Sequence, residues 1–187
     1  MKARTAGLVT LLTGALIVGT AAMGSAAPQT LSAKSSAPQV KVTLKPSSAQ
    51  LKSCYPRAEA KVTVDLTTGS RGFDTFTIKA KGLKPNTGFT VFLLEKSGPP
   101  FGAAEYFGDF TTNSKGEGAN QFKLIVEEAF AFDGATNVRT DLDAVGLWFA
   151  DEKDDDGCLG SGSPVTGFDG DGKAGVQMLN SGNKLLP

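Results

Sequence analysis

The residues best suited to chemistry form an acidic loop over 151–157, where five carboxylates accompany one lysine. Carboxylates this close repel one another unless water or a cation lies between them, and Ca²⁺ prefers oxygen ligands of this kind. Three of them match positions 1, 3 and 5 of an EF-hand loop, but Ser163 occupies position 12. A solvated acidic loop is the alternative, because charge runs are commonly just hydrated. The candidate calcium ligands are Glu152, Asp154, Asp156, Asp169 and Asp171.

Catalytic chemistry is restricted because the sequence contains no histidine. Ser-His-Asp and Cys-His sites are therefore excluded, as are zinc and copper sites that need histidine. Catalysis by two carboxylates, as in glycosidases, needs a separation of about 5 to 9.5 Å that the sequence does not reveal. On β-proteins such acids mostly keep the surface soluble, so we assign no catalytic residue. Asp109 is two residues before Thr111 and therefore on the same side of a strand, so we expect it to face outward. The candidate acids are Glu105, Asp109, Glu127, Glu128, Asp141 and Asp143.

The sequence holds two cysteines, Cys54 and Cys158, which are 104 positions apart. An even pair in an exported chain usually forms a disulfide. In the chain-entropy model, closing a loop of about 100 residues stabilises the fold by about 4.7 kcal/mol. A reactive thiol would need a partner base, and histidine is absent. We therefore predict a structural Cys54–Cys158 bridge that ties the start of the domain to the acidic loop.

The N-terminal segment 1–26 has the layout of a secretory signal peptide: a basic start, an apolar run and small residues at its end. Residues 27–53 are rich in Ala, Ser, Gln, Lys and Pro and are expected to form a disordered arm, with a candidate edge strand over 40–44. One domain is predicted over 54–183, followed by a tail over 184–187. The apolar run is too short to span a membrane, so we expect a secreted, extracellular protein without a membrane span.

Alternating or continuous apolar runs separated by turn residues predict the strands of this domain. Residues 89–94 are apolar at both parities, as in a central strand covered on both faces. The pattern favours an all-β fold, a two-sheet antiparallel β-sandwich of immunoglobulin-like or fibronectin-III-like type with six or seven strands and one disulfide. The predicted strands are 60–66, 76–81, 89–94, 106–112, 121–126, 145–150 and 176–179.

The segment 83–91 resembles the L-x-P-x-T-x-Y-x-V segment of fibronectin type III domains. Phe89 replaces the tyrosine and so lacks the hydroxyl that makes a tyrosine corner. The layout of signal peptide, one β-domain and an acidic cysteine loop also resembles secreted β-sandwich proteins of actinobacterial type. Neither resemblance implies a functional residue. The matching positions are Leu83, Pro85, Thr87 and Val91.

The charges of the chain balance, with 19 Lys plus Arg and 19 Asp plus Glu. Loss of 1–26 would leave 17 basic and 19 acidic residues, a net charge of −2, which does not favour nucleic acid as a partner. We expect a non-enzymatic extracellular binding or structural module, with Ca²⁺ as its candidate ion and an extracellular ligand or surface component as its partner. The alternatives are a carboxylate-dependent glycoside hydrolase acting on polysaccharide, and a surface partner or inhibitor that uses the loop 98–102.

Overall fold

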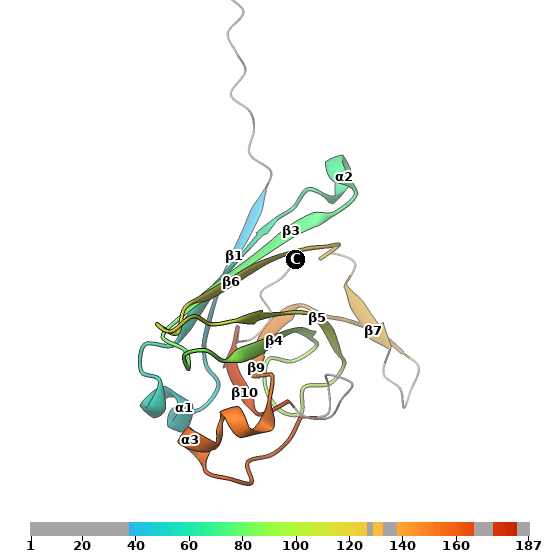
Figure 1. Ribbon diagram of the computed structural model, residues 1–187. Coiled ribbons are helices and arrows are strands. Elements are labelled where there is room, and N and C mark those ends of the chain that lie inside the picture. Colours follow the sequence, from blue (N-terminus) through green and yellow to red (C-terminus); the bar gives the residue numbers. More distant parts are fainter. Residues whose placement is uncertain (1–37, 127–128, 133–137, 167–173, 183–187) are drawn as a thin grey trace, which may run out of the picture. The chain divides into compact units, whose positions relative to one another are not determined.

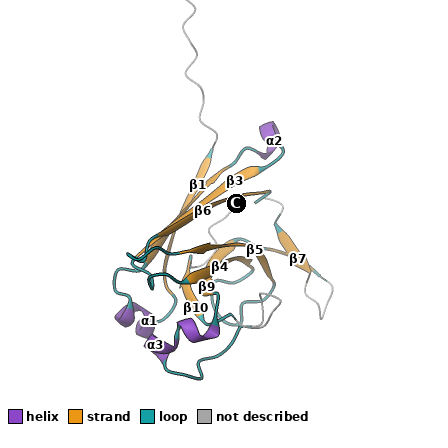
Figure 2. Cartoon of the chain, viewed as in Figure 1, coloured by secondary structure: helices purple, strands orange, loops and turns teal. Residues whose placement is uncertain are grey.

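The computed structural model describes residues 38–126, 129–132, 138–166 and 174–182. Strands dominate these ranges, and the helices are single turns or little more (Figure 2). The prediction of an all-β antiparallel fold with one disulfide is confirmed. The elements in chain order are β1 (Gln39–Pro46), α1 (Ala49–Cys54), β2 (Glu59–Asp65), α2 (Thr68–Arg71), β3 (Asp74–Lys81), β4 (Gly88–Leu94), β5 (Ala104–Thr111), β6 (Gly118–Leu124), β7 (Phe130–Phe132), β8 (Arg139–Asp141), β9 (Ala144–Phe149), a 3₁₀ turn η1 (Glu152–Asp154), α3 (Asp156–Leu159) and β10 (Gln177–Asn180).

Eight of the strands form one continuous sheet in the order β5-β4-β9-β10-β1-β2-β3-β6, while β7 and β8 pair separately. The prediction of a two-sheet sandwich with six or seven strands is therefore wrong in its architecture. The reason lies in β1, whose residues 39–44 pair with β2 while Lys45 and Pro46 pair with β10. Because one strand belongs to both halves, the sheet curls over its core into a nearly closed barrel instead of dividing (Figure 1).

For residues 38–53, the strand β1 and the helix α1 also correct the prediction of a disordered arm over 27–53, whose part 27–37 lies outside the described residues. The candidate strand over 40–44 is real, but it extends over Gln39–Pro46 and lies inside the sheet, not at its edge. Val42 and Leu44 are buried in the core. The following helix α1 is capped by Ser48, whose side chain accepts a hydrogen bond from Leu51 N–H at 3.2 Å. The folded region thus begins well before the predicted boundary at residue 54.

The core lies between the two halves of the curled sheet. Inward residues of β2 and β3 alternate with outward ones, as their period-two pattern predicts. In β4, Phe89, Val91 and Leu93 face this core, whereas Phe92 and Leu94 pack with Trp148 on the other face. The prediction that 89–94 is a strand covered on both faces is confirmed.

The loop 96–103 covers that second face of β4. Phe101, in the loop 98–102, packs its ring 5.1 Å from the Trp148 ring, measured between centroids. A partner-binding loop would need this aromatic side chain to project into solvent. The packing of Phe101 against the fold therefore counts against the interpretation of 98–102 as an inhibitory or surface-partner loop.

The predicted disulfide is present and joins Cys54, the last residue of α1, to Cys158 in α3, with 5.9 Å between the Cα atoms. The two short helices lie side by side at one end of the domain (Figure 1). No helix in the described ranges is long and apolar enough to cross a membrane. The predicted signal peptide over 1–26 and the tail over 184–187 lie outside the described residues.

Candidate functional site

The acidic loop folds into the turn η1 and the start of α3, and several of its carboxylates have protein partners. Asp155 is fully buried, and its carboxylate accepts hydrogen bonds from Val176 N–H at 2.8 Å and from the Ser163 hydroxyl. The Lys84 ammonium lies 2.7 Å from Asp154 Oδ1 and also donates to the Asp154 carbonyl. Asp154 and Asp155 consequently hold a structural turn, so this part of the loop is not simply solvated.

The buried end of this turn also affects a neighbouring tyrosine. Burial raises the pKa of Tyr55, the Lys84 charge lowers it, and Asp154 and Asp155 raise it further. Because phenolate is disfavoured beside two carboxylates in a partly dry site, Tyr55 stays neutral and serves packing. Its ring lies 6.4 Å from that of Phe149, measured between centroids.

The candidate calcium ligands are only partly brought together. Glu152 and Asp156 line a small cavity of about 260 Å³, whereas Asp154 faces Lys84. Asp169 and Asp171 lie outside the described residues. Within the residues that the structure describes, no group of three or more acidic, cysteine or histidine side chains could hold a metal ion. A calcium site therefore stays a prediction.

The four described candidate catalytic acids lie on β5, on β8 and between β8 and β9. Asp109 is exposed on β5, as predicted, and accepts a hydrogen bond from the Tyr106 hydroxyl at 2.7 Å. That hydrogen bond is the main cause of the raised pKa of Tyr106. Asp141 pairs instead with Arg139 on β8, and Glu105 is exposed on β5. Asp143 is half-buried between β8 and β9, and the remaining candidates Glu127 and Glu128 lie outside the described residues.

A cavity of about 430 Å³ lies beside α1, next to the loop that carries Phe101. Its polar side chains already bind the protein: Gln177 donates to the Ser97 carbonyl at 3.0 Å, and Gln50 donates to the Cys158 carbonyl at 3.2 Å. These two side chains stabilise the walls of the cavity, and their donor groups are already used in hydrogen bonds within the protein. Its lining is uncharged and consists of Ser47, Ser48, Gln50, Leu51, Gly98, Pro99, Phe101, Leu159, Pro164, Thr166, Val176, Gln177 and Asn180.

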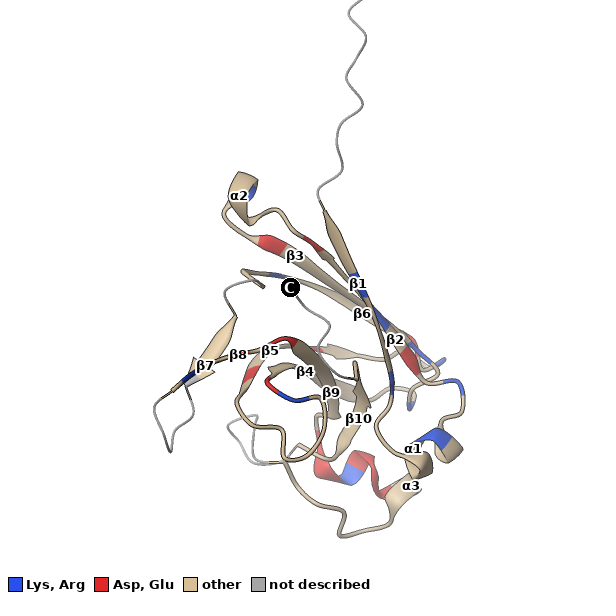
Figure 3. Cartoon of the chain, turned by 180° about the vertical axis from the view of Figure 1, so that it is seen from behind, with Lys and Arg blue, Asp and Glu red and all other residues tan. Residues whose placement is uncertain are grey.

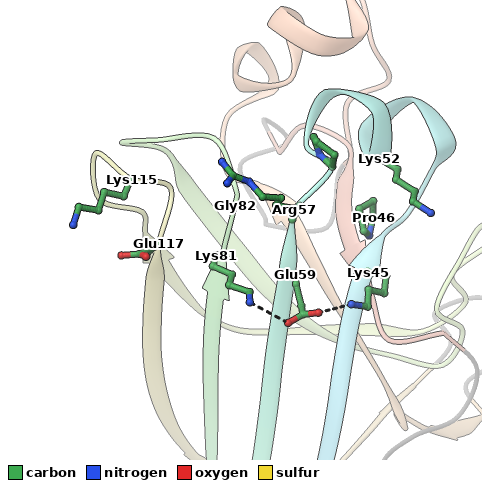
Figure 4. Close-up of a pocket in the computed structure, with 11 residues that line it drawn as sticks. Lys45, Pro46, Lys52, Arg57, Glu59, Lys81, Gly82, Lys115 and Glu117 are labelled. Atoms are coloured by element: carbon green, nitrogen blue, oxygen red, sulfur yellow. Dashed lines mark hydrogen bonds and ion pairs between the residues drawn. The ribbon is translucent and has the colours of Figure 1, made fainter.

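A pocket of about 810 Å³ is rich in basic side chains and lies where β1, β2 and β3 meet α1 (Figure 4). We call it the basic pocket. Five Lys and Arg side chains line it, against two Glu. Its volume is in the range of small-molecule sites, about 300 to 1,000 Å³. The lining residues are Lys45, Pro46, Lys52, Pro56, Arg57, Ala58, Glu59, Lys81, Gly82, Lys115 and Glu117.

Two glycines allow the backbone segments around the basic pocket to approach closely. Gly82 has φ +67°, and a Cβ there would lie 2.5 Å from the Arg57 carbonyl oxygen. Gly116 has φ +72°, and a Cβ there would lie 2.1 Å from the Leu83 carbonyl oxygen. Both conformations are easy only for glycine. The end of β3 is thereby held against the segment before β2 on one side and the β5–β6 turn on the other, which fixes the backbone that carries Arg57 and Lys115.

The electrostatics of the basic pocket centre on Glu59, which projects between Lys45 and Lys81 in Figure 4. Its carboxylate pairs with the ammonium of Lys45 and lies 3.7 Å from that of Lys81. The hydrogen bond from Lys45 is the main cause that lowers the pKa of Glu59, and the charges of Lys45, Lys81 and Lys61 add to this against the opposing effect of burial. Glu59 is thus ionised in a positive environment, and the basic side chains outnumber the carboxylates available to neutralise them.

The basic pocket was not predicted from the sequence, because the equal numbers of acidic and basic residues in the whole chain conceal a local excess of lysine. A local signal was present. Lysines recur with the outward parity of three predicted strand regions, at 41 and 45, at 61, and at 79 and 81. That parity would have placed several lysines on one side of a sheet. It would not have revealed that α1 brings Lys52 to the same end.

No family model, curated protein or solved structure matches this chain. The chemistry of the basic pocket is therefore the main indication of its function. Ammonium and guanidinium groups in an open pocket donate hydrogen bonds to carboxylate, phosphate or sulfate oxygens. The arrangement can bind an anion, because its five basic side chains outnumber its two carboxylates, Glu59 and Glu117.

Proposed function

We propose that the protein is a secreted, non-enzymatic binding module whose basic pocket holds an anionic group of an extracellular glycan. The observation that carries this proposal is the excess of cations in the pocket, where five basic side chains face only the two carboxylates of Glu59 and Glu117, and Glu59 is already paired with Lys45 and Lys81. An anion bound beside these side chains would reduce the repulsion among them. The disulfide supports an oxidising, extracellular location.

Binding is favoured over hydrolysis because two of the described candidate acids, Asp109 and Asp141, already have protein partners. Asp109 has Tyr106 as its partner, whereas Asp141 has Arg139, and these pairs lie on different strands. A glycosidase would need two carboxyl groups facing one sugar bond. The kinship to fibronectin type III domains is proposed for the segment Leu83 to Val91 alone, since the sheet as a whole is continuous.

The proposal is tested by titrating the full chain with trigalacturonate, a short carboxylated oligosaccharide, in a calorimeter at low salt. The double variant Lys52→Gln, Arg57→Gln removes two pocket charges and should weaken binding about tenfold, since each exposed charge contributes up to about 1 kcal/mol. Lys96→Gln is the matched control, because Lys96 is an exposed lysine on the loop after β4. Its affinity should equal that of the wild type.

Two results would contradict the proposal. One is the absence of measurable trigalacturonate binding by the wild type. The other is that the double variant, the Lys96→Gln control and the wild type all bind with the same affinity, which would mean that the ligand binds outside the basic pocket. Chromatography of the recovered oligosaccharide separates binding from hydrolysis, and a shortened product would favour the enzyme alternative instead.

A further inference from the structure

The strands β1, β2, β3 and β6 present one apolar face to the core and one polar face to solvent. Inward residues such as Val42, Val62 and Ile78 are buried. Outward positions carry lysine and threonine, with few carboxylates. We call this outer surface the lysine face. Its basic residues are Lys41, Lys45, Lys61, Lys79, Lys81 and Lys123, its acidic residues are Glu59 and Asp65, and its uncharged polar residues include Thr43, Thr63, Thr75, Thr77 and Gln121.

The strand register brings these side chains together on one surface. Lys61 of β2 lies directly opposite Lys79 of β3, and Thr43 of β1 is the neighbour of Lys61 on its other side. Like charges at directly opposed positions of antiparallel strands destabilise a sheet. An anion between Lys61 and Lys79 would remove this repulsion, so the face is arranged to gain stability from an anionic ligand.

The acidic residues of the lysine face are already engaged. Glu59 pairs with Lys45 and Lys81, and Asp65 accepts a hydrogen bond from the Gln39 amide at 2.6 Å. Glu59 also interacts with the charge of Lys61, but its direct ion pairs are with Lys45 and Lys81, so the repulsion between Lys61 and Lys79 is only partly offset. Basic positions can be followed along β1 and on α1 in Figure 3, whereas acidic positions gather near η1 and α3. Charge is thus separated within a chain that is neutral in total.

The lysine face is continuous with the basic pocket. Lys45, Glu59 and Lys81 belong to both, because they form the row of the sheet nearest to α1. Neighbouring strands lie about 4.8 Å apart, and residues on one face recur about every 7 Å along a strand. The lysine face is therefore about 14 Å wide across its four strands. Along the strands it extends roughly 20 Å beyond the basic pocket. A ligand longer than the pocket would extend over this surface.

We infer that a linear acidic polysaccharide lies along the lysine face with one of its anionic groups in the basic pocket. This inference rests on the proposed function and extends its ligand from a short group to a polymer. Ammonium groups would pair with the carboxylates of successive sugars, while the threonine hydroxyls donate and accept hydrogen bonds with sugar hydroxyls.

The composition of the lysine face distinguishes this ligand from other polyanions. Single-stranded nucleic acids stack their bases on a series of aromatic side chains, whereas the outward strand positions alternate mainly between lysine and threonine. Peripheral membrane binding uses apolar side chains that enter the lipid, and the same positions are polar. The surface is polar and rich in hydrogen-bonding side chains, which suits a polysaccharide.

The test compares trigalacturonate with long polygalacturonate on the wild type and on the triple variant Lys41→Gln, Lys61→Gln, Lys79→Gln. All three lysines lie outside the basic pocket and are exposed. We expect the wild type to bind the polymer more tightly than the trimer per binding site. The triple variant should lose about tenfold in affinity for the polymer and retain the wild-type affinity for the trimer. Matching far-UV circular dichroism and melting midpoints confirm that the variant is folded, and Lys96→Gln again serves as the control.

The outcomes separate the two proposals. If polymer and trimer bind alike and the triple variant matches the wild type, the polymer inference is overturned while the pocket proposal stands. If neither ligand binds, both fail. Stronger binding to double-stranded DNA, or to phosphatidylserine vesicles, than to polygalacturonate at the same salt would overturn the assignment of a polysaccharide.

Discussion

Asp74, at the start of β3, is a buried carboxylate whose partners are backbone N–H groups. Its Oδ1 accepts hydrogen bonds from Thr67 and Thr68 at 2.7 and 2.9 Å, and its Oδ2 accepts one from Val126 at 3.0 Å. Burial would raise the pKa of Asp74, but the hydrogen bonds, that of Val126 foremost, outweigh it and lower the pKa. One side chain thereby joins the β2–β3 connection to the segment that follows β6.

Asp74→Asn should lower the free energy of unfolding by about 2 to 4 kcal/mol, because hydrogen bonds to a charged acceptor contribute about 1.5 to 3 kcal/mol each and the amide presents a donor to one of these N–H groups. Urea unfolding followed by circular dichroism measures the loss. Asp65→Asn is the control, because Asp65 is partly exposed and accepts from the side chain of Gln39. An equal loss in both variants would show that the three backbone contacts carry no special weight.

The same carboxylate gives the protein a dependence on pH. Because the pKa of Asp74 is lower in the folded state than in the unfolded state, its contribution is present above the unfolded value of about 4 and is lost as pH falls through the folded value. Wild-type stability should therefore decline below about pH 4 more steeply than that of Asp74→Asn. Melting midpoints of the two proteins between pH 3 and 7 test this. Parallel curves would contradict it.

Single residues differ in how visible their roles are in the sequence. Asp74 has the same parity as Phe76 and Ile78, and a charged residue at an inward position is a readable sign of a buried hydrogen-bonding group. Asp155 gives no such sign, because it stands within a run of carboxylates and only the approach of Val176 and Ser163 distinguishes it. A buried acid of this kind depends on tertiary contacts that a local pattern does not contain.

At the scale of elements, the disulfide connects two helices that are too short to be stable by themselves. Helix α1 has six residues and α3 has four, and isolated helices of this length do not persist in water. The bridge between Cys54 and Cys158 holds them together across 104 positions. It also places the acidic turn beside α1.

Replacing both cysteines by serine should lower the free energy of unfolding by about 2 to 5 kcal/mol, as for native bridges in small exported domains. Thermal melting of the double variant measures this loss. The wild type melted with an excess of reducing agent should approach the variant, which controls for any effect of the serine hydroxyls. An unchanged midpoint in both experiments would mean that packing of α1 and α3 suffices.

The strands with clear hydrophobic periodicity could be predicted, whereas β1 could be predicted only in part. β3, β4 and β9 contain enough apolar residues for their type and length to be read directly. β1 follows a segment rich in polar and small residues, and its short alternation resembles an edge strand. Its interior position depends on the partners β10 and β2, which are distant from each other in sequence. The polar composition of this segment therefore did not reveal that β1 lies inside the sheet and makes it continuous.

At the scale of the whole molecule, charge is organised in a way that total charge conceals. The chain carries equal numbers of acidic and basic residues, yet β1, β2 and β3 concentrate lysine on their outer face, while carboxylates gather at η1 and α3. The period-two pattern predicts which lysines share a face. Which strands are neighbours follows from the fold, so the basic pocket and its continuation over the sheet could not be assembled from the sequence alone.

The continuity of the sheet predicts that the described domain unfolds as one cooperative unit. Ile78 on β3 is fully buried on one half of the sheet, whereas Trp148 on β9 is fully buried on the other. Ile78→Ala should lower the free energy of unfolding by about 2 to 5 kcal/mol. Since β1 pairs with both halves, Trp148 fluorescence should report the same reduced midpoint as far-UV circular dichroism, although Trp148 lies in the other half.

Thr77→Ala, at an outward position of the same strand, is the control and should change both midpoints little. If fluorescence kept the wild-type midpoint while circular dichroism shifted, the two halves would unfold independently, and pairing through β1 would be too weak to couple them.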